Sequence, residues 1–179
     1  MPTAPRKEIR LTRDEYIGPK IYFITICCED RFPIFNDGAR AKTVEALRRI
    51  SESQKFLVHA FCIMPDHVHF LLEGTVATSD IVRFVARWKQ FTGYAFREQL
   101  PPRFWQRRFY DYVLRKADES EAVAWYIWMN PVRKGIVGGP EQYPFSGSFT
   151  VEWPKITRPQ EDWAPPWKSV GARFSGSTS

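Results

Sequence analysis

Two histidines separated by one apolar residue, His67 and His69, are the residues of this chain whose types and spacing most directly suggest chemistry. They follow Pro65-Asp66, a pair typical of tight turns, and the residues after them are typical of a β-strand. Because side chains alternate along a strand, both imidazoles point to one face while Val68 points to the other. Two neighbouring neutral imidazoles suit a divalent metal, but a pair of half-buried polar histidines would show the same pattern.

Tyr126 and Asn130 form a second candidate pair. A helix is predicted over residues 118–129, and Pro131 stops it directly after Asn130. Side chains four residues apart project from the same side of a helix, so this pair should do so at the last turn. A tyrosine hydroxyl can attack a phosphodiester and form a phosphotyrosyl bond. The competing interpretation is that the tyrosine, with its aromatic and aliphatic neighbours, is a packing residue and that the asparagine only ends the helix.

The elements that must position these side chains follow a pattern typical of an α+β protein. The predicted elements are a strand over 20–28, a helix from 36 or 37 to about 54, a strand over 56–64, the histidine strand, a helix from 79 or 80 that ends before Pro101, and a strand over 103–115. The order strand, helix, strand, strand, helix, strand predicts a ferredoxin-like βαββαβ fold, an antiparallel sheet with both helices on one face. The histidine strand would then lie beside the first strand, and the additional helix with Tyr126 would lie over the open face.

Length and composition indicate one globular domain with extensions. The chain has 179 residues and a formal charge of +6. Its cysteines, Cys27, Cys28 and Cys62, are expected to be small core residues and not a disulfide framework. No apolar run approaches a membrane span and the N-terminus lacks the apolar core of a signal peptide, so a cytoplasmic protein without membrane contact is expected. The predicted divisions are a basic arm over 1–18, the main domain over 19–137, and a Gly-, Pro- and Trp-rich extension over 138–179.

The positive charge favours an anionic partner, of which nucleic acid is the commonest. Arginines line one face of the second predicted helix, and arginines alternate with aromatic residues over 103–115. This mixture can grip phosphates and stack unpaired bases, although an ordinary solvated surface would look similar in both places. The candidate DNA contacts are Arg83, Arg87, Arg103, Trp105, Arg107, Arg108, Arg115, Arg133 and Lys134.

Several stretches, taken together and in order, resemble a known family. They are Tyr22-Phe23-Ile24-Thr25, Met64-Pro65-Asp66-His67-Val68-His69, Phe104-Trp105-Gln106-Arg107-Arg108-Phe109 and Tyr126-Ile127-Trp128-Met129-Asn130-Pro131-Val132-Arg133-Lys134-Gly135. The set is similar to the REP-associated tyrosine transposases and their small insertion-sequence relatives, which are HUH (His-hydrophobic-His) single-strand nucleases. The resemblance implies that residues 19–137 are a ferredoxin-like catalytic domain. Such a domain cuts and rejoins single-stranded DNA beside hairpins through a covalent 5′-phosphotyrosine, with Mg²⁺ or Mn²⁺ as cofactor.

Residue by residue, the resemblance implies that His67 and His69 are metal ligands, Asn130 is a third, amide-type ligand, and Tyr126 is the nucleophile. It leaves both a monomer and a homodimer open, and it does not indicate the target sequence. Two other functions fit the same residues. One is a non-catalytic protein that binds structured single-stranded DNA or RNA, and the other is a metal-dependent hydrolase that activates a water.

Overall fold

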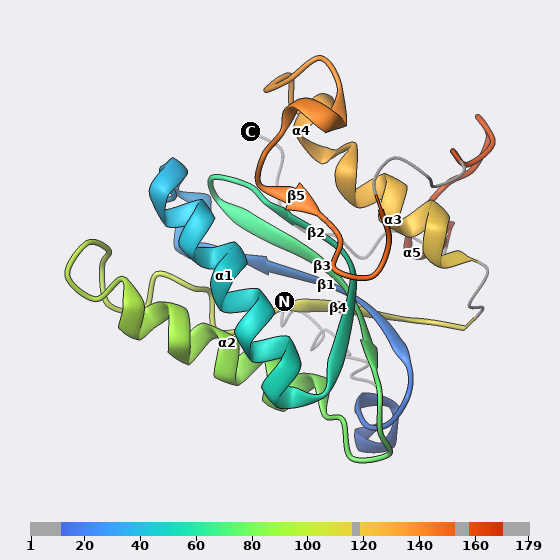
Figure 1. Cartoon of the computed structure of the whole chain (residues 1–179), viewed down its shortest axis with the longest axis horizontal. Coiled ribbons are helices and arrows are strands. Elements are labelled where there is room, and N and C mark those ends of the chain that lie inside the picture. Colours follow the sequence, from blue (N-terminus) through green and yellow to red (C-terminus); the bar gives the residue numbers. More distant parts are fainter. Residues whose placement is uncertain (1–11, 116–118, 153–157, 170–179) are drawn as a thin grey trace, which may run out of the picture.

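Five antiparallel strands form one sheet in the order β4-β1-β3-β2-β5 (Figure 1). The computed structural model describes residues 12–115, 119–152 and 158–169. The strands are β1 (Ile21–Cys27), β2 (Phe56–Ile63), β3 (His67–Gly74), β4 (Tyr110–Leu114) and β5 (Ser146–Gly147). The α-helices are α1 (Asp37–Gln54), α2 (Ile81–Ala95), α3 (Ser120–Trp128), α4 (Asn130–Arg133) and α5 (Pro166–Ser169). Short 3-10 helices are η1 (Arg13–Tyr16), η2 (Glu29–Arg31) and η4 (Pro140–Gln142).

The order of elements along the chain confirms the predicted fold class. β1, α1, β2, β3, α2 and β4 follow one another, and β3 lies beside β1 in the middle of the sheet. Side-chain oxygens of Asn36 and Asp80 accept hydrogen bonds from the backbone at the starts of α1 and α2, so the predicted caps form. α1 and α2 cover one face of the sheet and α3 lies over the other (Figure 1).

Alternation along β3 divides the core into two layers. Val68, Phe70 and Leu72 point toward α1 and α2 and are fully buried there. Leu71 points to the opposite face, where it packs with Phe23 of β1 and the apolar residues of α3. The face that carries the histidines is therefore the one covered by the tyrosine helix. This burial of large side chains on both faces fixes the register of β3, because a slip of one residue would exchange the faces.

The predicted strand over 103–115 is shorter in the structure, and β4 begins only at Tyr110. The Lys89 ammonium group donates hydrogen bonds to the carbonyl oxygens of residues 106, 107 and 108, at 2.7, 3.3 and 3.3 Å. The carbonyl groups of this segment are therefore satisfied by a side chain and not by a neighbouring strand. Only Trp105 makes an isolated bridge there, with Cys28, among the residues that the structure describes.

The two ends of the chain, as far as they are described, pack on the main domain. Gly18 N donates to Ser79 O at 2.8 Å, so the described part of the predicted arm contacts the segment between β3 and α2. β5 pairs with β2, and the Tyr143 hydroxyl donates to Ile63 O at 2.8 Å. The predicted extension therefore adds a strand to the same sheet. Among the described residues, no helix is both long and apolar enough to cross a membrane.

Candidate active site

His67 and His69 lie on the same face of β3, as the spacing predicts. Their ring centroids are 4.8 Å apart, and His67 is only 4% exposed. On the neighbouring strand, Cys27 is paired with His67 and Thr25 with His69. A central position between two strands holds both imidazoles in fixed places, which a metal site requires.

Each imidazole is oriented by a hydrogen bond to its Nδ1 atom. Asp66 Oδ1 lies 2.5 Å from His67 Nδ1, and Thr25 Oγ1 lies 2.8 Å from His69 Nδ1. When an oxygen is hydrogen-bonded to Nδ1, the Nε2 atom is the one that can bind a metal. Such a hydrogen bond at the other ring nitrogen is typical of metal-binding histidines. Arg31 Nη1 lies 3.8 Å from Asp66 Oδ2 and holds that carboxylate from its other side.

The charge states of these groups agree with a ligand role. Burial lowers the pKa of His69 well below its usual value, and the nearby His67, Arg133 and Arg31 lower it further. Burial of Asp66 opposes its ionisation, but its hydrogen bond to His67 and the charges of His67 and Arg31 lower its pKa overall. A cation site needs neutral imidazoles, and the lowered pKa of His69 favours this state. An ionised carboxylate such as Asp66, bonded to His67, adds negative charge next to the cation.

Asn130 brings an amide group to the histidines from a different part of the chain. Its Nδ2 atom lies 3.1 Å from His67 Nε2, and the side chain is 5% exposed. Pro131 accounts for this position: α3 ends at Trp128, and α4 starts again at Asn130 with the proline in its first turn. The predicted capping residue of α3, Asp118, lies outside the described residues.

Two imidazoles and one amide fit a divalent cation. The amide oxygen of Asn130 is a hard ligand suited to Mg²⁺ or Mn²⁺, and it belongs to the group that already contacts His67 Nε2. Within the described ranges, no three His, Cys, Asp or Glu side chains are grouped to hold a metal. The candidate ligand set is therefore complete only if Asn130 is counted.

Tyr126 of α3 is half-buried on the same face of the sheet. The Phe23 ring links it to the histidines, since the Phe23 centroid lies 6.3 Å from that of Tyr126 and 5.5 Å from that of His69. Arg133 of α4 contacts the tyrosine twice. Its Cζ is 4.1 Å from the ring centroid, and its Nη2 donates to the backbone carbonyl oxygen of Tyr126 at 2.8 Å. Asn130 contacts His67, and Tyr126 lies on the same face of the sheet, beside Phe23.

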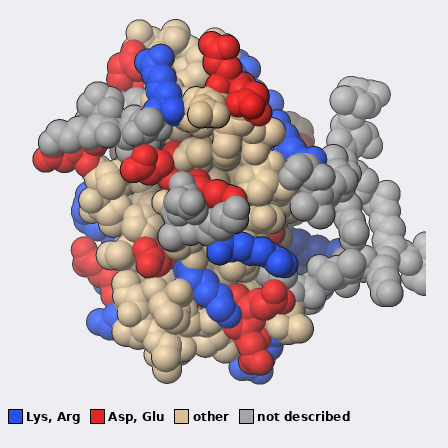
Figure 2. Space-filling view, turned by 90° about the vertical axis from the view of Figure 1, so that its right-hand side faces the viewer, with Lys and Arg blue, Asp and Glu red and all other residues tan. Residues whose placement is uncertain are grey.

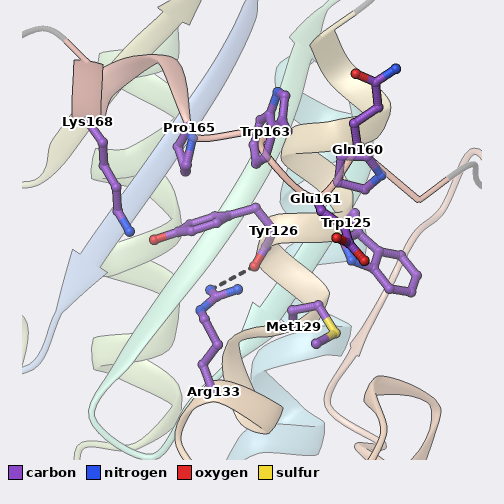
Figure 3. A pocket seen from close by; sticks show the side chains of 10 residues that line it. Trp125, Tyr126, Met129, Arg133, Gln160, Glu161, Trp163, Pro165 and Lys168 are labelled. Atoms are coloured by element: carbon purple, nitrogen blue, oxygen red, sulfur yellow. Dashed lines mark hydrogen bonds between the residues drawn. The ribbon is translucent and has the colours of Figure 1, made fainter.

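The C-terminal segment adds residues that the sequence did not single out. Trp167 of α5 stacks on Phe23 with a centroid separation of 4.1 Å, and its ring lies 5.4 Å from that of Tyr126. Lys168 Nζ is 5.6 Å from the Tyr126 ring centroid. Figure 3 shows this ammonium group at the hydroxyl end of the tyrosine. The only sequence signal was the excess of tryptophan in an otherwise polar extension.

The predicted DNA contacts fall in different places. Arg103, Arg107 and Arg108 are exposed next to the end of β1 that carries Cys27, because Gln106 N donates to Cys27 O at 2.9 Å. This is also the end of the sheet at which His67 lies. Arg133 contacts Tyr126, and Lys134 is exposed just after it at the end of α4.

The remaining predicted contacts lie away from the histidines. Arg83 and Arg87 are exposed on α2, behind the sheet, and Arg115 follows Leu114, which pairs with Ile21 at the far end of β1. Trp105 is corrected to a core residue: it is 7% exposed and its Nε1 donates to Thr92 Oγ1 at 2.9 Å, so its ring is not available to a base. On the face shown in Figure 2, basic side chains are interspersed with acidic ones.

Replacing Asp66 by asparagine should weaken Mn²⁺ binding by about 10- to 100-fold, because the group that orients His67 loses its charge. Calorimetric titration of the variant with Mn²⁺ measures this directly. Asp37→Asn, at the start of α1 and paired with Arg40, is the matched control. Equal affinities in all three proteins would show that the carboxylate does not prepare His67 as a ligand.

Comparison with known proteins agrees with the motifs. The family model described as "Transposase IS200 like" matches residues 20–130. A protein of Haemophilus influenzae named a REP-associated tyrosine transposase is 28% identical in an alignment of length 167 that covers 84% of this chain and 91% of that protein. The REP-associated tyrosine transposase of Escherichia coli is 24% identical over 153 residues, covering 79% of this chain and 88% of that protein.

A solved structure supports the same conclusion for the fold. The structure of a REP-associated tyrosine transposase bound to a REP hairpin superimposes with a TM-score of 0.68. It is 22% identical in sequence and covers 78% of this chain and 81% of that chain. Since the family model spans more than half of the sequence, this chain belongs to the IS200-like transposase family.

Proposed function

We propose that this chain is a metal-dependent single-strand DNA endonuclease and strand transferase that cuts and rejoins DNA next to hairpin elements. The observation that carries the proposal is the contact between Asn130 and His67, which are 63 residues apart in the sequence. This contact joins the end of the tyrosine helix to the histidine strand. Membership of a transposase family supports strand transfer, and a structural relative bound to a REP hairpin supports hairpin DNA as the partner.

His67 Nε2, His69 Nε2 and the Asn130 amide oxygen would hold a divalent cation, Mg²⁺ or Mn²⁺. When bound, such a cation polarises a phosphodiester oxygen and fixes the position of the scissile phosphate. Asp66 and Thr25 occupy the Nδ1 atoms of the two rings, which leaves the Nε2 atoms to face the cation, and the Asn130 amide group already lies at His67 Nε2.

Tyr126 would be the nucleophile. Its hydroxyl oxygen forms a bond to the scissile phosphorus, and the bond from phosphorus to the 3′-oxygen of the preceding nucleotide breaks. The products are a strand with a free 3′-hydroxyl and a strand joined to the protein through its 5′-phosphate. A second 3′-hydroxyl can reverse the step and join a new strand, because the covalent bond keeps the energy of the broken diester and no ATP is required.

The exposed arginines next to the histidine end of the sheet would hold the single-stranded backbone. Replacing Arg107 and Arg108 together by alanine should reduce the slope of log affinity against log salt concentration by roughly 1.4, because each lost phosphate contact on a single strand contributes about 0.7. The measurement is binding of a fluorescent hairpin oligonucleotide with unpaired flanks at increasing salt.

Arg83 and Arg87 provide a control with the same change in charge, because they lie on α2 behind the sheet. The double alanine variant of these two residues should keep the slope of the unmodified protein. If this control lowers the slope and the Arg107/Arg108 variant does not, the DNA runs over the helical face and the proposed path is wrong.

The experiment that tests the proposed reaction analyses the ends of the products. Hairpin oligonucleotides built from short palindromes that recur around the coding sequence are incubated with the protein and Mn²⁺. Strand transfer through a phosphotyrosine predicts one product with a 3′-hydroxyl and one product whose 5′-phosphate is attached to protein. A free 5′-phosphate formed without any attached intermediate would support the hydrolase with an activated water, and binding without cleavage would support the non-catalytic protein.

A further inference from the structure

A hollow of about 350 Å³ lies beside Tyr126, between α3 and residues 159–168. Trp125, Tyr126 and Arg133 form part of one wall, and Gln160, Trp163 and Lys168 form part of the other (Figure 3). Its size falls within the range of sites for small ligands, which is about 300–1,000 Å³. It is partly open to solvent, so a flexible strand can enter it.

The lining combines aromatic rings with cations. The Trp163 centroid is 6.4 Å from that of Tyr126, and Arg158 Cζ lies 5.1 Å from the Trp125 centroid. Arg133 and Lys168 both approach the Tyr126 ring, at 4.1 and 5.6 Å from its centroid. Aromatic faces next to Arg and Lys side chains are the combination with which proteins bind unpaired nucleotides, through stacking of the base and attraction of the phosphate.

Lys168 lies where the phosphate would be in the proposed reaction, and Arg133 lies over the ring of the same tyrosine. In Figure 3 the Lys168 ammonium group is at the hydroxyl end of Tyr126, and Trp163 and Trp125 lie on the side of the ring away from Lys168. A nucleotide that places its phosphate at the hydroxyl can therefore direct its base toward Trp163. Glu161 also lines the hollow, and in the view of Figure 3 its carboxylate lies farther than the Lys168 ammonium group from the Tyr126 hydroxyl.

We propose that this hollow is a subsite for one unpaired nucleotide, the one whose 5′-phosphate becomes joined to Tyr126. Its base stacks on Trp163, and its phosphate is held by Lys168 and Arg133. The inference rests on the proposed function, because it places the scissile phosphate at the tyrosine. It makes residues 159–168 part of the substrate site. Stacking tolerates any base, so the subsite fixes the position of the strand without selecting its sequence.

The first test is photochemical crosslinking, which requires no cleavage. The full chain, without added metal, is irradiated with hairpins whose unpaired flank carries one 5-iodouracil at successive positions. The peptide that contains Trp163 should crosslink at one flank position and not at its neighbours. Crosslinks that form only elsewhere on the protein would overturn the subsite and leave the proposed function standing. Hairpins that do not bind at all would overturn both.

The second test uses substitutions of Trp163. Trp163→Ala should reduce affinity for hairpins with an unpaired flank by roughly 10-fold, because stacking of one base is lost. Affinity for the same stem without a flank should not change, and Trp163→Phe should restore most of the loss. Tyr94→Ala, which removes an aromatic ring that is 68% exposed on α2, is the matched control.

An increase of affinity or cleavage in Trp163→Ala would show the opposite role, in which the C-terminal segment covers Tyr126 and excludes the strand. An equal loss of affinity for hairpins with and without a flank would also contradict the subsite. Trp163→Ala could also change affinity by disturbing the local structure. Crosslinking uses the unmodified chain, so its result does not depend on whether the variant keeps that structure.

Discussion

Tyr126→Phe should reduce cleavage of hairpin DNA by roughly 10⁴- to 10⁶-fold and remove every covalent protein–DNA adduct. The phenyl ring keeps the contacts with Phe23, Trp167 and the Arg133 guanidinium group, so only the hydroxyl is lost. Binding of the hairpin should therefore stay within about 2-fold of the unmodified protein. Gel analysis of single-turnover reactions in Mn²⁺ gives the cleavage rate, and denaturing gels of the same samples show the adduct.

A matched substitution separates the nucleophile from general effects of removing a hydroxyl. Tyr94→Phe makes the same change on an exposed tyrosine of α2, behind the sheet, and should cleave at the rate of the unmodified protein. If Tyr126→Phe keeps most of its turnover, the hydroxyl is not the nucleophile and a water must attack the phosphate. The hydrolase alternative would then describe the histidine site better than strand transfer does.

His69→Ala should reduce cleavage by about 10³-fold or more and weaken Mn²⁺ binding, because the cation loses one of two imidazole ligands. Desolvation lowers the pKa of His69 well below its usual value, so the ring is available as a ligand at neutral pH without first losing a proton. Calorimetric titration with Mn²⁺ measures binding, and single-turnover cleavage at saturating Mn²⁺ measures the remaining rate. Hairpin binding in the absence of metal should be nearly unchanged.

His59→Ala is the control for this prediction. His59 lies on β2 and is hydrogen-bonded to Glu73 and Thr150, at 2.5 and 2.9 Å. It is therefore a histidine with hydrogen-bond partners in the fold that is not one of the candidate metal ligands. Its removal should leave Mn²⁺ affinity and cleavage at saturating metal within about 3-fold of the unmodified protein. Equal effects of His59→Ala and His69→Ala would mean that the loss reflects stability and not ligation.

Much of the fold could be predicted because local patterns and tertiary structure agree. The alternating apolar residues of the histidine strand, the caps at Asn36 and Asp80, and the order of elements all lead to the same sheet. The common face of His67 and His69 follows from the two-residue period of a strand alone. Such features depend on neighbours in the sequence, so no knowledge of the tertiary structure was needed.

Other features depend on contacts between distant residues. Trp105 lies among arginines and aromatic residues in the sequence, which is typical of a nucleic-acid surface. In the structure its backbone makes an isolated bridge with Cys28, and its buried ring donates a hydrogen bond to Thr92. The orienting role of Thr25 arises only from the register of β1 against β3. The packing of Trp167 on Phe23 joins residues from opposite ends of the chain, and no local pattern predicts it.

The positions of the arginines illustrate the same limit. Periodicity places Arg83 and Arg87 on one exposed face of a helix, and this is correct. Which face of the sheet that helix covers is decided by the side of β3 that carries Val68 and Phe70, opposite the histidines. The arginines of α2 are therefore separated from the candidate site by the sheet, whereas Arg107 and Arg108 lie at its histidine end.

The proposed reaction requires Tyr126 to form a covalent bond to the 5′-phosphate of single-stranded DNA. The most direct measurement is mass spectrometry of the protein after reaction with a hairpin oligonucleotide in Mn²⁺, followed by nuclease and protease digestion. The peptide containing Tyr126 should gain the mass of a phosphonucleotide, with the added mass located on Tyr126. Cleaved DNA together with an unmodified Tyr126 peptide, or with the added mass on another tyrosine, would contradict the proposed reaction.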